Sequence, residues 1–144
     1  MLRVSPRTLA EIPIELEEAS PGKIVTIRDL FFLGGQAVLL PKSEPELPKI
    51  LRFMQINPHL KIEIAGHVNV PNAPPVLETS TNWDLSERRA KLIYDFLLEN
   101  GIPIEQLTYQ AYGNHEMKYP RARSESEMVF NRRVEIRILE VMKM

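Results

Sequence analysis

The residues of this chain best suited to do chemistry are those able to hold a small charged ligand. Arg89 carries a planar guanidinium, whose paired N–H groups match the two oxygens of a carboxylate. The run Gly34-Gly35-Gln36 can turn backbone N–H groups toward a ligand, because glycine has no Cβ to obstruct them. Asn82 adds a side-chain amide, and Asn69 offers a carbonyl oxygen that accepts from an ammonium group. Together these groups suit a ligand with a carboxylate and an ammonium on one carbon.

Four short motifs contain or flank these residues, in a fixed order along the chain. Phe31-Phe32 opens a loop over residues 33–43, which ends in the pattern Leu-x-Pro-x-Ser. The other motifs are Gly66-His67-Val68-Asn69, Asn82-x-x-Leu85-Ser86-x-x-Arg89-Ala90 and Asn131-Arg132-Arg133-Val134-Glu135. Over roughly residues 24–139 this set resembles the signature of the OmpA C-terminal-like domains, the peptidoglycan-binding modules of OmpA, Pal and MotB.

The resemblance implies a ligand, the diaminopimelate residue of the peptidoglycan stem peptide. In the family, the arginine of an Arg-Ala pair takes the ligand carboxylate, and the aspartate of a Thr-Asp pair takes its amine. By resemblance these roles fall on Arg89 and Asn69. The full set of expected ligand-binding residues is Gly34, Gly35, Gln36, Asn69, Asn82, Leu85, Arg89 and Arg132.

This sequence departs from the family pattern at three positions. Asn69 replaces the usual aspartate, and Leu33 and Gly35 stand where many members carry acids. These changes remove negative charge from the pocket. We therefore expect weaker or differently selective binding of a zwitterion.

Simpler structural roles compete with these assignments. Arg89 could form a salt bridge to Glu87 or Asp84 on a helix surface, although we expect its guanidinium on the helix flank, where truncation leaves the fold intact. Asn69 could be a turn residue. Arg132 and Arg133 could serve solubility at a sheet edge by pairing with Glu140 or Glu135. Strand alternation places these two arginines on opposite faces, and it is Arg132 that we assign to the site.

Composition bounds the class of protein. The chain has 144 residues, 44% of them hydrophobic, which suits one domain with a real core. Its 18 basic and 19 acidic residues give a net charge of −1, so we expect no nucleic-acid partner. No apolar run approaches the length of a membrane span.

No motif in the sequence indicates catalysis or a cofactor. The chain has no cysteine, and we expect no metal site, because His59, His67 and His115 lack ligand spacing and have no clustered carboxylates beside them in sequence. Gly34-Gly35 lacks the residues of a phosphate loop, and Ser86 lies outside any nucleophile elbow. Phe31 and Phe32 suit a core better than a ligand platform. We therefore expect a protein that is not an enzyme.

Hydrophobic periodicity predicts an α+β fold in the order βαβαββ, with two main helices on one face of a mixed sheet and an extra N-terminal strand. The first helix should begin near Pro45, and a capping box of Asp84 and Glu87 should open the second. A short helical turn follows Ser124. The predicted apolar stripe of the second helix is Leu85, Leu92, Ile93, Phe96 and Leu97. The predicted strands cover residues 12–16, 24–32, 60–64, 107–111 and 134–138.

We divide the chain into an extension with an edge strand, residues 1–22, and an OmpA-like peptidoglycan-binding domain, residues 23–144. The proline-containing segment 70–81 is expected to bulge into solvent as a flap over the pocket, with Glu78 supplying negative charge. Shortening this segment should then leave thermal stability nearly unchanged.

Two functions remain open from the sequence. The first is a non-catalytic anchor, a fragment of a longer exported protein that tethers envelope or secretion-machine proteins to the cell wall on the periplasmic side. The second is a degenerate domain of the same fold that docks proteins. The Gly-His-Val-Asn variant and the insertion after it also look like domains from type IX secretion and gliding machinery.

Overall fold

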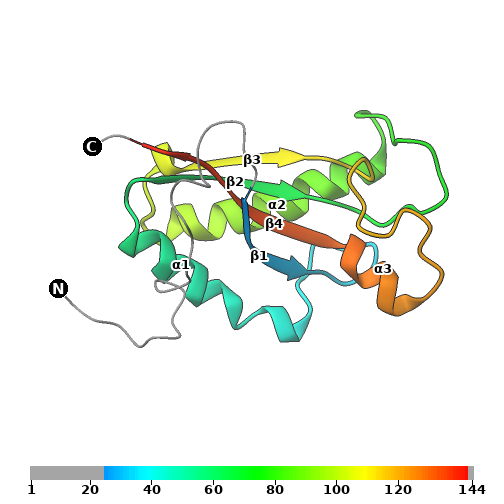
Figure 1. Cartoon of the computed structure of the whole chain (residues 1–144), viewed down its shortest axis with the longest axis horizontal. Helices are drawn as coiled ribbons and strands as arrows, with labels where there is room; N and C mark the ends of the chain where they lie inside the picture. The colour runs from blue at the N-terminus through cyan, green and yellow to red at the C-terminus, as the bar shows by residue number, and fades with distance from the viewer. Residues whose placement is uncertain (1–24, 143–144) are drawn as a thin grey trace.

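The computed structural model describes residues 25–142, which form a four-stranded sheet with helices (Figure 1). This confirms the predicted α+β class and the order of its elements; the predicted strand at 12–16 lies outside the described residues. The strands are β1 (Val25–Phe31), β2 (Leu60–Gly66), β3 (Leu107–Ala111) and β4 (Arg133–Val141). The helices are α1 (Glu46–Ile56), α2 (Thr81–Glu99) and α3 (Glu125–Asn131).

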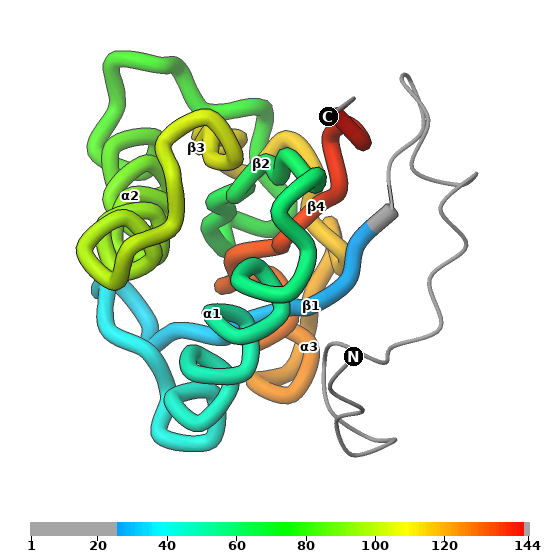
Figure 2. The backbone as a smooth tube through the Cα atoms, turned by 90° about the vertical axis from the view of Figure 1, so that its left-hand side faces the viewer, coloured from blue at the N-terminus to red at the C-terminus, as the bar shows by residue number. Residues whose placement is uncertain are grey.

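The sheet has the order β1-β4-β2-β3, so the last strand in sequence lies in its interior. β4 runs antiparallel to both β1 and β2, while β2 and β3 are parallel. Val134, Ile136 and Ile138 of β4 belong to the apolar core, together with residues of α1 and α2. Both helices lie on one side of the sheet (Figure 2). The intervening residues of β4 therefore face the opposite side, and these are charged.

The first helix begins as predicted. Pro45 is its N-cap residue and Glu46 its first helical residue, which leaves Pro48 in the first turn, where its missing N–H costs no hydrogen bond. The Ser43 hydroxyl does not cap this helix. It accepts a hydrogen bond from the backbone N–H of Phe31 at 3.0 Å and so ties the end of the first loop to β1.

The predicted start of the second helix is wrong. The helix begins one turn earlier, where the Ser80 hydroxyl caps it by accepting from the Trp83 N–H at 3.2 Å. Asp84 lies within the helix and pairs with Arg88 at 2.9 Å. Ser80 offers the same capping chemistry as Asp84, so local sequence alone does not distinguish them. The predicted stripe also fails at Leu92, which is 42% exposed, whereas Ala90 is buried.

Close packing of α2 on β2 fixes the position of the site residues. A Cβ at Gly66 would lie 1.9 Å from the carbonyl oxygen of Ser86 and 3.1 Å from the Cβ of Ala90. The strand therefore meets the helix one residue before His67 and three residues before Arg89. None of the helices within residues 25–142 is long and apolar enough to cross a membrane.

We expect Gly66→Ala to lower the free energy of unfolding by about 2–3 kcal/mol, because an added methyl group must displace helix backbone. Urea denaturation measures this change. Gly34→Ala is the matched control, since its new Cβ would meet only the end of the Arg132 side chain at 3.5 Å. Equal stability of the two variants would contradict the account of this contact.

Candidate functional site

Four segments distant in sequence gather at one end of the molecule (Figure 1). They are the first loop (33–43), the second loop (67–80), the third loop (112–124) and α3. Backbone hydrogen bonds hold them together, from the Phe32 N–H to the Arg132 carbonyl and from the His67 N–H to the Arg133 carbonyl, both at 2.9 Å. The Val68 N–H donates to the Gly113 carbonyl at 3.0 Å.

Arg89 is the centre of this arrangement. Its side chain is buried, with the residue 1% exposed, and its guanidinium donates to three backbone carbonyls. Nε donates to Gln36 at 3.0 Å, Nη1 to His67 at 2.9 Å and Nη2 to Leu33 at 2.9 Å. The predicted position on the helix flank is therefore wrong, because this side chain joins the first loop to the end of β2.

The alternative of a surface salt bridge for Arg89 is also wrong. Asp84 pairs with Arg88, and no carboxylate of the described residues pairs with Arg89. Burial lowers the pKa of Arg89 to about 10, and the nearby charges of Arg132 and Arg88 act in the same direction. The guanidinium still carries its charge at neutral pH. It is a buried cation held by backbone dipoles and by the face of the Phe32 ring, whose centroid lies 5.3 Å from Cζ, with further N–H groups on Nη1 and Nη2 able to bind an anion.

Several of the predicted site residues lie close to the Arg89 guanidinium in the structure. Gly34, Gly35 and Gln36 are exposed in the turn that Arg89 holds, and Gly35 has φ +69°, a conformation that favours glycine. Arg132 lies against the same turn, since a Cβ on Gly34 would be 3.5 Å from its Cζ. Arg132 also pairs with Glu125 at 2.6 Å. Two guanidinium groups therefore flank the glycine turn.

The second helix contributes two more of the predicted residues. Asn82, Leu85 and Arg89 are spaced at i, i+3 and i+7, so they share one face of α2. Leu85 is buried and Asn82 is half-buried. The described contacts include no hydrogen bond between Asn82 and the first loop, so its role as a ligand contact stays a prediction.

Asn69 lies at the same end but already has a partner. Its Oδ1 accepts from Nδ2 of Asn131 at 2.9 Å. The Asn131 side-chain amide also forms two hydrogen bonds to the backbone of Tyr119, both at 2.9 Å. Its Oδ1 accepts from the Tyr119 N–H, and its Nδ2 donates to the Tyr119 carbonyl. Asn69 is thus fixed in orientation, which supports the turn-like role, and its binding of an amine remains a prediction.

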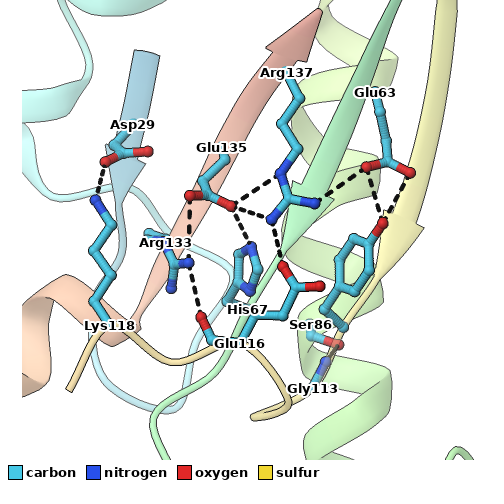
Figure 3. A network of polar contacts seen from close by, with 11 residues as sticks. Asp29, Glu63, His67, Ser86, Gly113, Glu116, Lys118, Arg133, Glu135 and Arg137 are labelled. Carbon is cyan, nitrogen blue, oxygen red and sulfur yellow. Dashed lines mark hydrogen bonds and ion pairs between the residues drawn. The ribbon is translucent and has the colours of Figure 1, made fainter. Parts of the chain in front are cut away.

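A network of charged side chains covers the face of the sheet away from the helices, and the sequence predicts only part of it (Figure 3). Glu135 lies at its centre, bonded to His67 Nε2 at 2.9 Å, to Arg133 Nη2 at 3.3 Å and to Arg137. Arg137 also reaches Glu116 at 2.6 Å. Of the alternative role for Arg133, the pairing with Glu135 is present, but solubility at a sheet edge is wrong, because Arg133 is buried on an interior strand. Alternation of Arg133, Glu135 and Arg137 along β4 was the available signal.

Burial and charge set the protonation states in this network. Burial lowers the pKa of His67 more than its hydrogen bond to Glu135 raises it. Burial would raise the pKa of Glu135, but the hydrogen bond from His67 and the charge of Arg133 together hold it well below its usual range. His67 is therefore neutral and donates from Nε2, while Glu135 is ionised.

His67, Glu116 and Glu135 place possible metal-ligand atoms within 4.8 Å of one another, so the fold supplies the carboxylates that the sequence does not place beside a histidine. The cation that these carboxylates need is already present, because Arg137 bonds to both of them and Arg133 to Glu135. A metal ion would have to displace both guanidinium groups. The cluster is better explained as a structural charge network.

Most of the segment 70–81 is exposed to solvent, as expected, but hydrogen bonds fasten it to the third loop, and this corrects the expectation that the segment can be shortened without loss of stability. Buried Asn114 fastens it by donating to the carbonyls of Val70 at 3.2 Å and Pro74 at 3.1 Å and by accepting from the Val76 N–H at 2.8 Å. The Asn72 N–H donates to the Pro120 carbonyl at 2.8 Å. Shortening this segment would strip a buried amide of its partners, so the expectation of unchanged thermal stability is withdrawn.

Comparisons with known proteins agree with the geometry. A profile of the OmpA family matches residues 31–132. Motility protein B of Bacillus subtilis is 33% identical over 132 residues, which cover 90% of this chain and 49% of that protein. The chain therefore spans about half the length of that relative.

Two solved structures share the fold. The peptidoglycan-associated lipoprotein from Burkholderia pseudomallei superposes with a TM-score of 0.62 at 17% identity, covering 76% of this chain and 87% of that one. The cell wall anchor of the T6SS from Pseudomonas aeruginosa gives a TM-score of 0.60 at 24% identity, covering 76% and 74%. At these identities the likeness concerns the fold alone.

We expect Arg89→Met to lower the free energy of unfolding by about 2–4 kcal/mol, because three backbone carbonyls lose their donor while the side-chain volume is kept. Urea denaturation measures this loss. Arg88→Met is the matched control one residue earlier, since the Arg88 side chain is 53% exposed. A loss no larger than that of the control would show that the three bonds contribute little to folding.

Stability should also fall in mild acid because of His67. Unfolded histidine takes up a proton near its ordinary pKa of 6.5, whereas the lowered pKa of buried His67 keeps the folded state neutral to lower pH. The unfolded state therefore binds more protons below about pH 6.5, and the free energy of unfolding decreases as pH falls. The carboxyl group of Glu135 has an ordinary pKa of 4.5 and a lowered pKa in the folded protein. It therefore reduces the free energy of unfolding further only in stronger acid, below about pH 4.5.

Urea titrations between about pH 5 and 8 separate the histidine contribution. His67→Gln, which retains a donor but cannot titrate, should show a shallower dependence on pH than the parent protein. Parallel curves for the two proteins would mean that His67 does not sense pH.

Proposed function

Since this chain belongs to the OmpA family, whose profile matches residues 31–132, we propose that it binds peptidoglycan without catalysis and anchors a larger envelope protein to the cell wall. The printed names of its structural neighbours, a peptidoglycan-associated lipoprotein and a cell wall anchor, support this direction. On this proposal, residues 23–144 are the wall-binding domain and residues 1–22 lead into it. The domain works on the periplasmic side of the envelope, and its other partners bind through the rest of the parent chain.

One observation carries the proposal, the buried Arg89 guanidinium without a carboxylate partner among the described residues. Proteins rarely leave a buried cation without a counterion, because desolvation is costly. A ligand carboxylate bonded to Nη1 and Nη2 would supply the missing charge. The exposed Gly34-Gly35 turn and the second guanidinium, that of Arg132, lie beside this position.

The ligand we propose is the diaminopimelate residue of the stem peptide, with a carboxylate on Arg89 and an ammonium directed to Asn69. The interaction with the ligand's ammonium group is weaker than the interaction with its carboxylate. Asn69 has no formal charge and shares its carbonyl with Asn131, and no acid stands at Leu33 or Gly35. The carboxylate therefore dominates recognition, and selectivity for the amine is reduced.

A protein-docking function is the second candidate. Leu77 is 72% exposed in the second loop, and its carbonyl accepts from both the N–H and the hydroxyl of Ser80, while Asn114 holds the preceding residue, Val76. An aliphatic side chain can bury apolar area against a protein partner but offers no hydrogen bond or charge to a zwitterionic ligand. The narrower origin in type IX secretion or gliding machinery stays a prediction from the sequence.

Sedimentation with purified sacculi, followed by calorimetric titration of a diaminopimelate-containing tripeptide, tests the proposed function. Arg89→Lys should weaken binding of the tripeptide at least about tenfold, because an ammonium keeps the charge but cannot present paired N–H groups to a carboxylate. Near-ultraviolet circular dichroism checks that the variant is folded at the titration temperature. Arg88→Lys should bind as the parent does, and parental affinity in Arg89→Lys would rule the site out.

Asn69→Asp should tighten binding of the same tripeptide. An aspartate oxygen can still accept from Asn131, and it places a formal charge where the ammonium is proposed to lie. The gain should shrink at high salt, because the new attraction is partly solvent-exposed. An unchanged or larger dissociation constant would show that Asn69 does not face the amine.

A further inference from the structure

A hollow of about 440 Å³ lies beside the proposed site and is lined by basic side chains. Its walls are Lys118, Tyr119, Pro120, Arg121, Arg123 and Glu127. This volume is within the range of small-ligand pockets. The hollow contains none of the residues assigned above to the proposed site, so its charge calls for a separate explanation.

Among the described residues, ion pairing accounts for one of the three cations of the hollow and leaves the other two without an acidic partner. Lys118 bonds to Asp29 at 2.6 Å. Arg121 and Arg123 are exposed and form no ion pair with any residue in the range 25–142 that the structure describes. Glu127 forms no ion pair with either arginine, and its Oε1 accepts from the backbone N–H of Arg123 at 2.8 Å; its single negative charge leaves a net positive charge on the three side chains.

The backbone around these arginines is fixed. Ala122, between them, is 4% exposed, and its N–H donates to the Tyr119 carbonyl at 3.0 Å. The amide of Asn131 holds Tyr119 on both its N–H and its carbonyl. The Tyr119 ring packs against Phe130 with centroids 6.0 Å apart. The two guanidinium groups therefore extend from a rigid turn, which lowers the entropy lost when an anion is bound.

The hollow also connects to the proposed site through hydrogen bonds. Asn131, which is hydrogen-bonded to the backbone of Tyr119, also donates to Asn69 Oδ1 at 2.9 Å. The next residue, Arg132, lies against Gly34 of the Arg89 pocket. Asn131 and Arg132 therefore link the proposed site to Tyr119 in the wall of the hollow.

We propose that Arg121 and Arg123 form a second anion subsite, which binds another carboxylate of the same wall peptide. This inference rests on the proposed function, since a stem peptide is what would place two carboxylates on one extended chain. The paired N–H groups of arginine suit a carboxylate, and the rigid Tyr119 and Pro120 wall suits the peptide backbone between the two charges. The subsite compensates for the missing acid at Asn69, because it adds affinity through the acidic groups of the ligand.

Calorimetry with two tripeptides tests the subsite. One is the diaminopimelate-containing stem tripeptide with a free carboxylate on its middle glutamate residue, and the other is amidated at that carboxylate. The parent protein should bind the free acid about three- to tenfold more tightly. The double variant Arg121→Gln/Arg123→Gln should lose this preference, whereas Arg52→Gln, at an exposed arginine of α1, should keep it.

The outcomes separate the subsite from the proposed function. If the double variant keeps the preference while Arg89→Lys loses binding, the subsite is overturned and the wall-binding function stands. If the parent binds neither tripeptide, the wall-binding function fails and the wall-peptide subsite fails with it. Titration of the parent with glutarate, followed by amide NMR, then tests the anion site itself. Shifts confined to residues 119–123 and absent in the double variant support it, and no shifts overturn it.

Discussion

The Arg89 guanidinium is the interaction on which the rest of the site depends. It donates to carbonyls of Leu33 and Gln36 in the first loop and to His67 at the end of β2, so one side chain of α2 joins three parts of the fold. The contact of Gly66 with the Ser86 carbonyl sets the distance between helix and strand that allows this reach. A cation in this position costs desolvation energy, and backbone dipoles offset only part of that cost. The site is therefore built into the core and is completed by an anion from outside.

His67 links this cation to the other face of the sheet. Its carbonyl accepts from Arg89, while its ring donates to Glu135, which Arg133 and Arg137 hold in place. The charged network thus fixes the position of His67, whose carbonyl is one of the three that orient the guanidinium. Each charged group of the network has an oppositely charged partner, although Arg133 Nε and Nη1 and His67 Nδ1 have no hydrogen-bond partner among the described residues. The network is positioning machinery, and its residues need not touch a ligand.

Much of the fold could be predicted from the sequence because its signals are local. Alternation in β4, proline at the start of α1 and glycine after α2 each report on a few neighbouring residues. The start of α2 could not be predicted, since Ser80 and Asp84 offer equivalent caps one turn apart. The choice between them depends on how the second loop packs on Asn114, which is a long-range contact.

The sequence predicted which residues form the proposed site but not how deeply Arg89 is buried in it. Motifs named Arg89 and the glycine turn, yet no pattern in α2 indicates that the guanidinium lies 1% exposed beneath backbone carbonyls. The cluster of His67, Glu116 and Glu135 joins residues from separate segments, so no sequence spacing could reveal it. The basic hollow was equally hidden, because Arg121 and Arg123 are distinguished from its other cation only once Asp29 is known to pair with Lys118 and Glu125 with Arg132.

The most direct measurement is a crystal structure of the domain with a diaminopimelate-containing tripeptide bound. The account predicts a ligand carboxylate within hydrogen-bond distance of Nη1 and Nη2 of Arg89, with the three bonds to Leu33, Gln36 and His67 still in place. A ligand bound elsewhere, or an Arg89 side chain withdrawn from those carbonyls to reach it, would contradict the claim that the core itself forms the anion receptor.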